Sequence, residues 1–335
     1  MKNPPASLAH LDFVAGIPSL DLSHFTHGTE AQRTQFVHDL GTAYREVGFV
    51  AIGGHGIPQD VIDGLYSEAE AFFALPAETK AQHEHPEHNR QRGFVSFGTE
   101  HAKDSDAADL KEFWQVGQCD VPKGADMKHY PPNAVVAERP QLSVKSEALF
   151  RSMEAVGRDV LKAIALHLDL EEDYFEAYVP GGNSILRLIH YPPILQEPKS
   201  SVRAGQHEDI NLITLLVGAS ASGLEVMDTA GNWTPVTALP NQLVVNVGDM
   251  LQRLTNQELK STTHRVVNPP RELWGKPRFS MPFFCHPVPH MSLDALEQCV
   301  PAGEAPKEAP ITAGAYLAER LREIGLVRDD ASEKE

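Results

Sequence analysis

The sequence has few cysteines, few basic residues and no long apolar segment. Its 335 residues include three cysteines, and 29 Lys and Arg stand against 46 Asp and Glu, which gives a formal net charge of −17. An odd number of widely spaced cysteines predicts neither a disulfide framework nor a cysteine-rich zinc site. The acidic balance argues against nucleic acid and against an anionic membrane surface as partners, because both attract basic faces.

Targeting signals are also missing. The first five residues, MKNPP, are not followed by the continuous apolar stretch of a secretion signal. No run approaches the roughly 18 apolar residues that a membrane-spanning helix needs. We therefore expect a cytoplasmic protein whose partner is a small-molecule substrate, and the sequence leaves its oligomeric state open. The acidic balance does not exclude an anionic substrate, since one buried arginine can outweigh distant surface charge.

The first half of the chain reads as mostly helical. Apolar residues at helical spacing predict helices, and β-branched runs before glycine predict strands. We expect an edge strand at 17–22, helices at 29–47, 59–75 and 142–168, a buried strand at 48–52, and mostly loop at 90–140.

The pattern changes after Gly181 and Gly182 to short apolar runs separated by Gly, Pro and Asn. Such runs predict a β-sandwich, barrel or jelly roll with helices packed outside one sheet. We see no linker and therefore expect one domain over 1–335, with a helix-rich part at 1–180 packing on a β core at 181–290 and a helical tail at 291–335. The expected strands are 184–191, 211–217, 224–228, 233–236, 243–247, 262–267 and 279–285.

The strongest chemical signal is the tripeptide His207-Glu208-Asp209, followed by His264 on a second β-like run 57 residues after His207. Residues i and i+2 of a strand share a face, so His207 and Asp209 should point together, with Glu208 turned away. Two imidazoles and one carboxylate form a facial triad for Fe(II), which leaves coordination positions open for substrate and O2. With 16 histidines in the chain, the tripeptide alone would more often be a surface pair.

A second motif supports the metal hypothesis. Arg278 and Ser280 follow His264 by one strand and again share a strand face. A planar guanidinium with an adjacent hydroxyl can hold a carboxylate through two parallel hydrogen bonds and a third contact. Taken alone, an edge-strand arginine paired with an acid would be the more common explanation. Its place one strand after the distal histidine makes it informative.

Together these motifs resemble the isopenicillin N synthase-like branch of the Fe(II)/2-oxoglutarate dioxygenases, over residues 17 to about 287. Four further segments support the resemblance: GFVAIGGHGI at 48–57, RLIHYPP at 187–193, GLEV at 223–226 with Trp233, and NVGDM at 246–250. The resemblance implies a mainly β protein with flanking helices and a double-stranded β-helix (jelly-roll) core.

The resemblance also implies roles for single residues. His207, Asp209 and His264 would be the metal-binding and catalytic residues. Arg278, Ser280 and Tyr191 would bind the distal carboxylate of 2-oxoglutarate, and Arg187 would face the substrate. The segment departs from the family at two places, because Ile189 and His190 stand where Asn and Tyr are usual.

The implied function is oxidation of a small organic metabolite, by hydroxylation, desaturation or cyclisation, with Fe(II) and with 2-oxoglutarate and O2 as co-substrates. One alternative is an oxidase of the same fold that uses O2 without 2-oxoglutarate, since the R-x-S motif could hold a substrate carboxylate instead. A jelly-roll binding module without catalysis is another, which the intact triad disfavours. The histidines at 83, 85 and 88 could bind a metal, but their acidic, polar surroundings favour a solvated loop.

Overall fold

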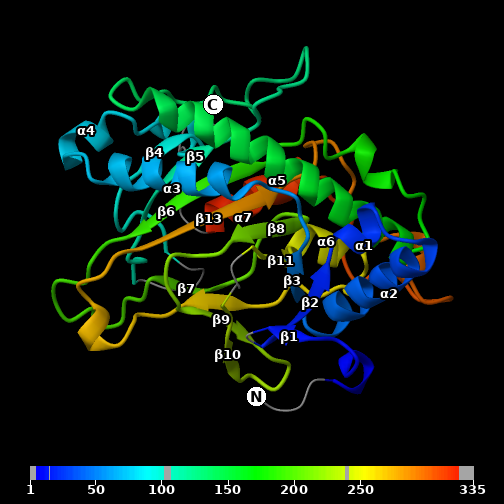
Figure 1. Cartoon of the computed structure of the whole chain (residues 1–335). Helices are drawn as coiled ribbons and strands as arrows, with labels where there is room; N and C mark the ends of the chain where they lie inside the picture. Colours follow the sequence, from blue (N-terminus) through cyan, green and yellow to red (C-terminus); the bar gives the residue numbers. More distant parts are fainter. Residues whose placement is uncertain (1–4, 15, 102–106, 238–240, 324–335) are drawn as a thin grey trace.

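Two β-sheets form the centre of the molecule, and helices cover one of them (Figure 1). The computed structural model describes residues 5–14, 16–101, 107–237 and 241–323. The major, nine-stranded sheet has the order β1 (Phe13–Val14), β2 (Ile17–Asp21), β3 (Phe49–Gly53), β11 (Leu243–Val247), β8 (Ile213–Val217), β13 (Arg278–Cys285), β6 (Ile185–Tyr191), β5 (Glu112–Val116) and β4 (Gly93–Val95). The minor, four-stranded sheet has the order β10 (Trp233–Pro235), β9 (Leu224–Met227), β12 (His264–Val266) and β7 (Ala204–His207).

The two sheets pack on each other through their inner faces. Phe49 and Val244 of the major sheet belong to one buried cluster with Leu224 and Val226 of the minor sheet. A second cluster joins β6 and β5 to β7 and β12 near the other end. The interior between the sheets is therefore lined by residues from strands of both sheets, which is the geometry of a jelly roll.

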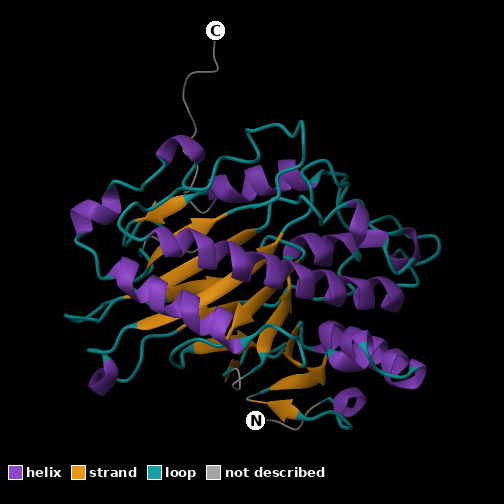
Figure 2. Ribbon diagram, turned by 45° about the horizontal axis from the view of Figure 1, so that its top comes forward, coloured by secondary structure: helices purple, strands orange, loops and turns teal. Residues whose placement is uncertain are grey.

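Helices α3 (Gln59–Phe73) and α5 (Pro140–His167) lie side by side across the outer face of the major sheet (Figure 2). Proline is the first residue of α5, where its missing N–H costs nothing, and buried apolar residues recur along one side of the helix. The remaining helices are α1 (Ser23–Thr26), α2 (Glu30–Glu46), α4 (Ala77–Ala81), α6 (Asp249–Leu254) and α7 (Ala313–Glu323), with 3-10 turns η1 (Ala6–Leu8), η2 (Pro86–His88), η3 (Tyr174–Ala177), η4 (Arg271–Leu273) and η5 (Glu297–Cys299).

The residues at the two ends of helix α2 explain why it begins and ends close to the predicted bounds. Thr29 and Gln32 form a reciprocal capping box at its start. Gly48, just beyond its end, adopts a φ of +76°, a backbone conformation that side chains other than glycine rarely adopt. A Cβ at this position would also collide with Thr262 and with the Lys260 carbonyl. The sharp turn lets the chain pass directly from α2 into β3, an interior strand of the major sheet.

The sheet-rich architecture with flanking helices is confirmed, but one local prediction was incomplete and one was wrong. The described part of segment 90–140 is mostly loop, as predicted, but it also contains two short strands that the sequence pattern missed, β4 and β5, which extend the major sheet beside β6. Strand β5 carries buried Glu112 and Gln115 and so lacks apolar alternation. The run at 17–22 is not an edge strand, since β2 lies between β1 and β3. Among the described residues, no helix is long and apolar enough to cross a bilayer.

Candidate active site

His207, Asp209 and His264 meet at one end of the interior between the sheets. His207 is the last residue of β7 and lies directly opposite His264, the first residue of β12, in the ladder that joins the two strands. The Nε2 atoms of His207 and His264 lie 4.0 and 3.8 Å from Asp209 Oδ1. One ligand atom from each residue lies within 4.8 Å of the others, so the three could hold one metal ion.

Asp209 reaches this position by a different route from the one that the strand pattern suggests. Strand β7 ends at His207, so alternation along a strand does not aim the carboxylate. Instead, the Asp209 carbonyl accepts a hydrogen bond of 2.7 Å from the Asp249 N–H at the start of α6. Asn246 of β11 donates to Asp209 Oδ2 at 2.8 Å, which leaves Oδ1 facing the histidines. The neighbouring Glu208 turns outward and accepts from the Thr263 hydroxyl at 2.8 Å.

Both imidazoles are oriented by backbone carbonyls. His207 Nδ1 lies 2.7 Å from the Gly205 oxygen, and His264 Nδ1 lies 3.1 Å from the Thr262 oxygen. A carbonyl oxygen only accepts, so each Nδ1 carries the hydrogen and each Nε2 presents a lone pair. Hydrogen bonds of this kind to the second nitrogen are the usual support of metal-binding histidines.

Charge around the triad favours the protonation states that bind metal. Burial, with the nearby His264, lowers the pKa of His207 to about 4, so this imidazole is neutral near pH 7. Burial alone would raise the pKa of Asp209, but His264 and His207 outweigh it and lower the pKa overall. A neutral imidazole and an ionised carboxylate are the forms that coordinate a divalent cation. The donor set therefore fits Fe(II).

Arg278, Ser280 and Tyr191 lie deeper in the interior, on neighbouring strands. Arg278 of β13 stands directly opposite Tyr191 of β6, and its guanidinium lies 4.9 Å from the centre of the Tyr191 ring. Arg278 Nη1 donates to Ser280 Oγ at 3.4 Å, and its Nε donates to the Ala221 carbonyl. Only 2% of Arg278 is exposed, and no described carboxylate lies within ion-pair distance. A buried cation without a counter-ion is costly, so this place suits the carboxylate of a ligand.

Arg203, which sequence reasoning missed, adds a second buried cation to this region. It is 2% exposed, its Nε has no hydrogen-bond partner among the described residues, and its guanidinium lies 5.9 Å from the Tyr191 ring. Burial and the charge of Arg278 lower its pKa to about 10. The available signal was its position four residues before His207, on the same face of the chain.

The two departures from the family pattern fall on opposite faces of β6. Ile189 lies opposite Ser280 and faces the interior, so the usual amide there is replaced by an apolar side chain. His190 faces the other side, where its Nδ1 lies 2.8 Å from Glu112 and its ring stacks on Phe279 at 4.7 Å. His190 is therefore part of the packing between sheet and helices rather than of the site.

A cavity of about 380 Å³ opens beside His207 and Asp209. Its walls come from β5, β6 and β13 of the major sheet, from residues 100–101, 109 and 111, and from α7. Asp249 also lines it, and burial raises the pKa of that carboxyl to about 7. The sequence suggested that loops within 90–140 would line the substrate pocket, but it did not place α7 there, because α7 approaches the cavity only through the tertiary fold.

Arg187 lines this cavity, as the sequence suggested, but it is not free. Its Nη1 lies 3.2 Å from a carboxylate oxygen of Glu100, and its Nε donates to Gln115 at 3.1 Å. The guanidinium also lies 4.2 Å from the Phe113 ring centre and 5.2 Å from that of Phe284. Arg187 thus differs from Arg278 in having a buried carboxylate partner.

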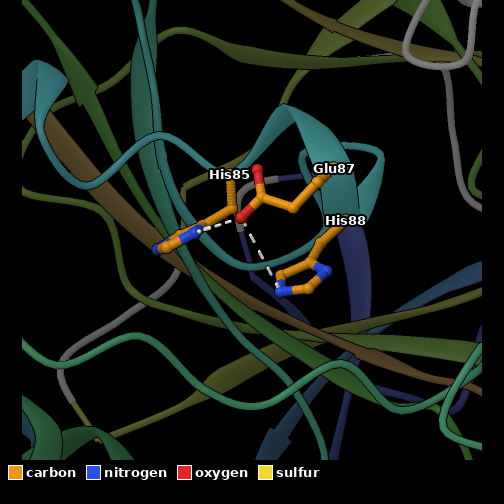
Figure 3. A group of neighbouring side chains, drawn as sticks. All are labelled: His85, Glu87 and His88. Atoms are coloured by element: carbon orange, nitrogen blue, oxygen red, sulfur yellow. Dashed lines mark hydrogen bonds and ion pairs between the residues drawn. The ribbon is translucent and has the colours of Figure 1, made fainter.

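A second group, His85, Glu87 and His88, lies on the surface turn η2 (Figure 3). Figure 3 shows the three side chains converging, with His85 Nδ1 2.9 Å from Glu87 Oε1. That hydrogen bond accounts for their closeness, and the Glu87 side chain is 59% exposed. His83 lies apart from the group and faces Glu138. The arrangement matches the solvated loop that the sequence favoured.

Two family models match the chain. Residues 17–138 match the N-terminal region of non-haem dioxygenases in morphine synthesis, and residues 182–287 match the 2OG-Fe(II) oxygenase superfamily. A 2-oxoglutarate-Fe(II) type oxidoreductase of Emericella nidulans is 33% identical over 309 residues, which are 88% of this chain and 86% of that protein. A proline hydroxylase of Petromyces alliaceus is 33% identical over 91% of this chain and 98% of its own length.

Solved structures agree with these matches. A 2OG-Fe(II) oxygenase family protein of Caulobacter crescentus superimposes with a TM-score of 0.83, at 43% identity over 93% of this chain and 100% of that chain. A full-length Neurospora crassa protein, solved with alpha-KG (2-oxoglutarate) and thymine, has a TM-score of 0.80 at 31% identity, over 91% of this chain and 96% of that chain. The double-stranded β-helix fold is confirmed, and the chain belongs to the 2OG-Fe(II) oxygenase superfamily, whose oxidoreductases use Fe(II), 2-oxoglutarate and O2.

Proposed function

We propose that His207, Asp209 and His264 hold the catalytic Fe(II) of a dioxygenase that oxidises a small organic molecule. The observation that carries this assignment is the convergence of two imidazoles and one carboxylate, each fixed by its own hydrogen bond. His207 and Asp209 line the 380 Å³ cavity, where a substrate would lie beside the metal.

We assign the distal carboxylate of 2-oxoglutarate to Arg278 and Ser280, with Tyr191 beside them. The support is the buried Arg278 guanidinium, which has no described acid partner and lies on the same inward face as Ser280. Arg203 adds positive potential without donating to an acid. Ile189 leaves the wall beside Ser280 apolar, which excludes water and strengthens the charge-assisted contact.

Bound iron supplies the coordination and activation of O2 that oxidise an unactivated carbon position. The protein positions the reactants and keeps bulk water away. Asn246 and the Gly205 and Thr262 carbonyls hold the ligands in place, and Asp249 at the start of α6 anchors the Asp209 backbone. The outcome could be hydroxylation, desaturation or cyclisation, depending on which substrate atom lies nearest the metal.

The same-fold oxidase that uses O2 without 2-oxoglutarate is the alternative that the R-x-S motif left open. The Emericella nidulans relative is named for 2-oxoglutarate, and the Neurospora crassa structure contains it, which favours the dioxygenase. The same structure contains thymine, a small heterocycle, and this supports a small-molecule substrate here. The four supporting segments of the sequence favour the isopenicillin N synthase-like branch.

We also propose a reducing, cytoplasmic setting. Cys119, Cys285 and Cys299 are all free thiols, and burial raises the pKa of Cys285 above its usual range. Buried, protonated thiols of this kind are packing residues rather than nucleophiles.

The experiment that tests the function uses the full-length protein loaded with Fe(II) without oxygen. Addition of 2-oxoglutarate should produce the weak visible absorption of a metal chelate, and oxygen should then release succinate slowly even without a substrate. An iron-loaded protein that shows no such band and consumes O2 only with an organic substrate would be the oxidase instead.

A further inference from the structure

We propose that the cavity selects an uncharged, flat, hydrogen-bonding substrate and rejects carboxylates, because Arg187 is already neutralised by Glu100. This inference rests on the proposed function, since it concerns the prime-substrate side of the same site. It reverses the simplest expectation for an arginine that faces a substrate cavity, which is that it binds an acid.

The Arg187–Glu100 pair is buried and geometrically defined. Arg187 Nη1 lies 3.2 and 3.3 Å from the two Glu100 carboxylate oxygens. The Arg187 and Glu100 side chains are 14% and 8% exposed. Ion pairs that are shielded from water are screened little, and separating one leaves both charges without compensation. An incoming carboxylate would have to displace Glu100 or place a second negative charge beside it.

Lys111, a second cation that lines the cavity, is also neutralised by carboxylates. Lys111 forms ion pairs with Glu100 and with Asp109, the latter at 2.8 Å. Asp109 Oδ1 in turn accepts from the Gly205 N–H at 2.8 Å, two residues before the metal ligand His207. The four side chains thus form one buried network with no net charge, and it connects the substrate wall to the strand that carries His207.

The rest of the cavity adds negative charge rather than positive. In the described part of the chain, the Lys and Arg side chains that line it are Lys111, Arg187 and Arg320, and each has a carboxylate partner. His286 also lines the cavity, and burial lowers its pKa to about 4, so it contributes no positive charge at pH 7. The acidic residues that line it are Glu100, Asp109, Glu208, Asp209, Asp249 and Glu323.

The polar groups that remain suit a neutral ring. Arg187 Nη2 has no hydrogen-bond partner among the described residues, so it can donate to a carbonyl or ring nitrogen. Gln91 also lines the cavity and offers both a donor and an acceptor. The side chains of Phe284 and Ile185 supply apolar surface beside these polar groups.

Matched probes on one ring test the charge preference directly. Carboxamide, carboxylate and aminomethyl forms of benzene and of pyridine would be titrated by calorimetry into the protein loaded with Fe(II) and 2-oxoglutarate, without oxygen. We expect the carboxamide to bind at least about tenfold more tightly than its carboxylate, which corresponds to roughly 1.4 kcal/mol. Tighter binding of the charged form on both rings, or no binding by either carboxamide, would overturn the proposal.

Glu100→Gln tests the cause of that preference. This change should free the Arg187 charge, so the ratio of carboxylate to carboxamide affinity should rise by about tenfold or more. Glu208→Gln is the matched control, because it removes a carboxylate from the cavity rim that has no contact with Arg187, and it should change the ratio much less than Glu100→Gln does. An unchanged ratio in a folded Glu100→Gln protein would contradict the mechanism. If that variant does not fold, the ranking of the probes on the wild type decides.

The two levels of the proposal fail in different ways. A protein that shows no 2-oxoglutarate chelate and releases no succinate would contradict the proposed function. A protein that turns over 2-oxoglutarate but prefers benzoate to benzamide would contradict only the inference about the substrate.

Discussion

Two arginines on inward strand faces, Arg278 and Arg187, have opposite electrostatic situations. Arg278 is 2% exposed and has no described carboxylate partner, whereas Arg187 is bound to Glu100 at 3.2 Å. Both guanidinium groups are buried between the two sheets, so residue type and strand position do not distinguish their roles. The counter-ion does, because a buried cation without one requires an anion from the ligand. In our proposal, this difference places the carboxylate of 2-oxoglutarate at Arg278 and a neutral substrate beside Arg187.

The largest effect is expected at the point where the two ends meet. Asp209→Ala should abolish turnover and remove most Fe(II) affinity, because only two imidazoles would remain in the ligand set. Iron content after dialysis in chloride-free buffer and succinate release would measure this. His207→Ala and His264→Ala should behave in the same way. Glu208→Ala should keep its iron, since that side chain faces Thr263, and tight iron binding by Asp209→Ala would refute the triad.

The comparison itself is tested by removing each arginine in turn. Arg278→Ala should weaken 2-oxoglutarate binding by roughly 3–5 kcal/mol, the scale for a buried charge that loses its only partner. Arg187→Ala should leave that binding near the wild-type value and reduce only the stimulation by a substrate. Titration of the visible chelate band measures the first effect, and succinate release measures the second.

Arg278→Lys refines the same comparison. We expect partial recovery of 2-oxoglutarate affinity, because a point charge does not reproduce the two-donor fork. Equal loss of 2-oxoglutarate binding in the Arg278 and Arg187 alanine variants would remove the distinction between the two ends.

Acid should destabilise the metal-free protein, because His286, which lines the cavity, is buried in its neutral form. The pKa of His286 falls from 6.5 to about 4 on burial, so the unfolded chain binds the proton more readily. Its contribution to stability is therefore present above pH 6.5 and is lost as the pH falls towards 4, by on the order of 2 kcal/mol. Urea unfolding at pH 7.5 and pH 5 would measure the change. His286→Gln should lessen the difference, although His207 acts in the same direction.

The smallest effect is expected at Ser280. Ser280→Ala should weaken 2-oxoglutarate binding by about 1–2 kcal/mol, the scale of one hydrogen bond to a charged group. The chelate titration would report it, with Thr in place of Ala as the conservative control that keeps the hydroxyl. A loss as large as that of Arg278→Ala would mean that Ser280 positions the guanidinium rather than contacting the ligand.

Predictions from periodicity were confirmed where one face of an element is buried. Strand β11 has the predicted bounds, and α2, α3 and α5 lie within two residues of theirs at each end. Within segment 90–140, which is mostly loop as predicted, the sequence pattern missed strand β5, because this strand is buried on both faces and carries Glu112 and Gln115. Both polar side chains find partners in distant segments, Lys80 and Arg187. Polar residues that are buried through such distant partners cannot be recognised from the alternation of apolar and polar residues in the sequence.

The sequence by itself determined the chemistry of the metal end. The spacing of His207, Asp209, His264, Arg278 and Ser280 predicted residues that the fold then brought together, because a ligand set depends on residue types and short-range geometry. Only the tertiary structure decided how Asp209 is aimed, since the turn after β7 and the Asn246 hydrogen bond replace strand alternation. It also decided the charge at the substrate end. Glu100 neutralises Arg187 from 87 residues away in the chain, and no local pattern reports which distant carboxylate a folded arginine will meet.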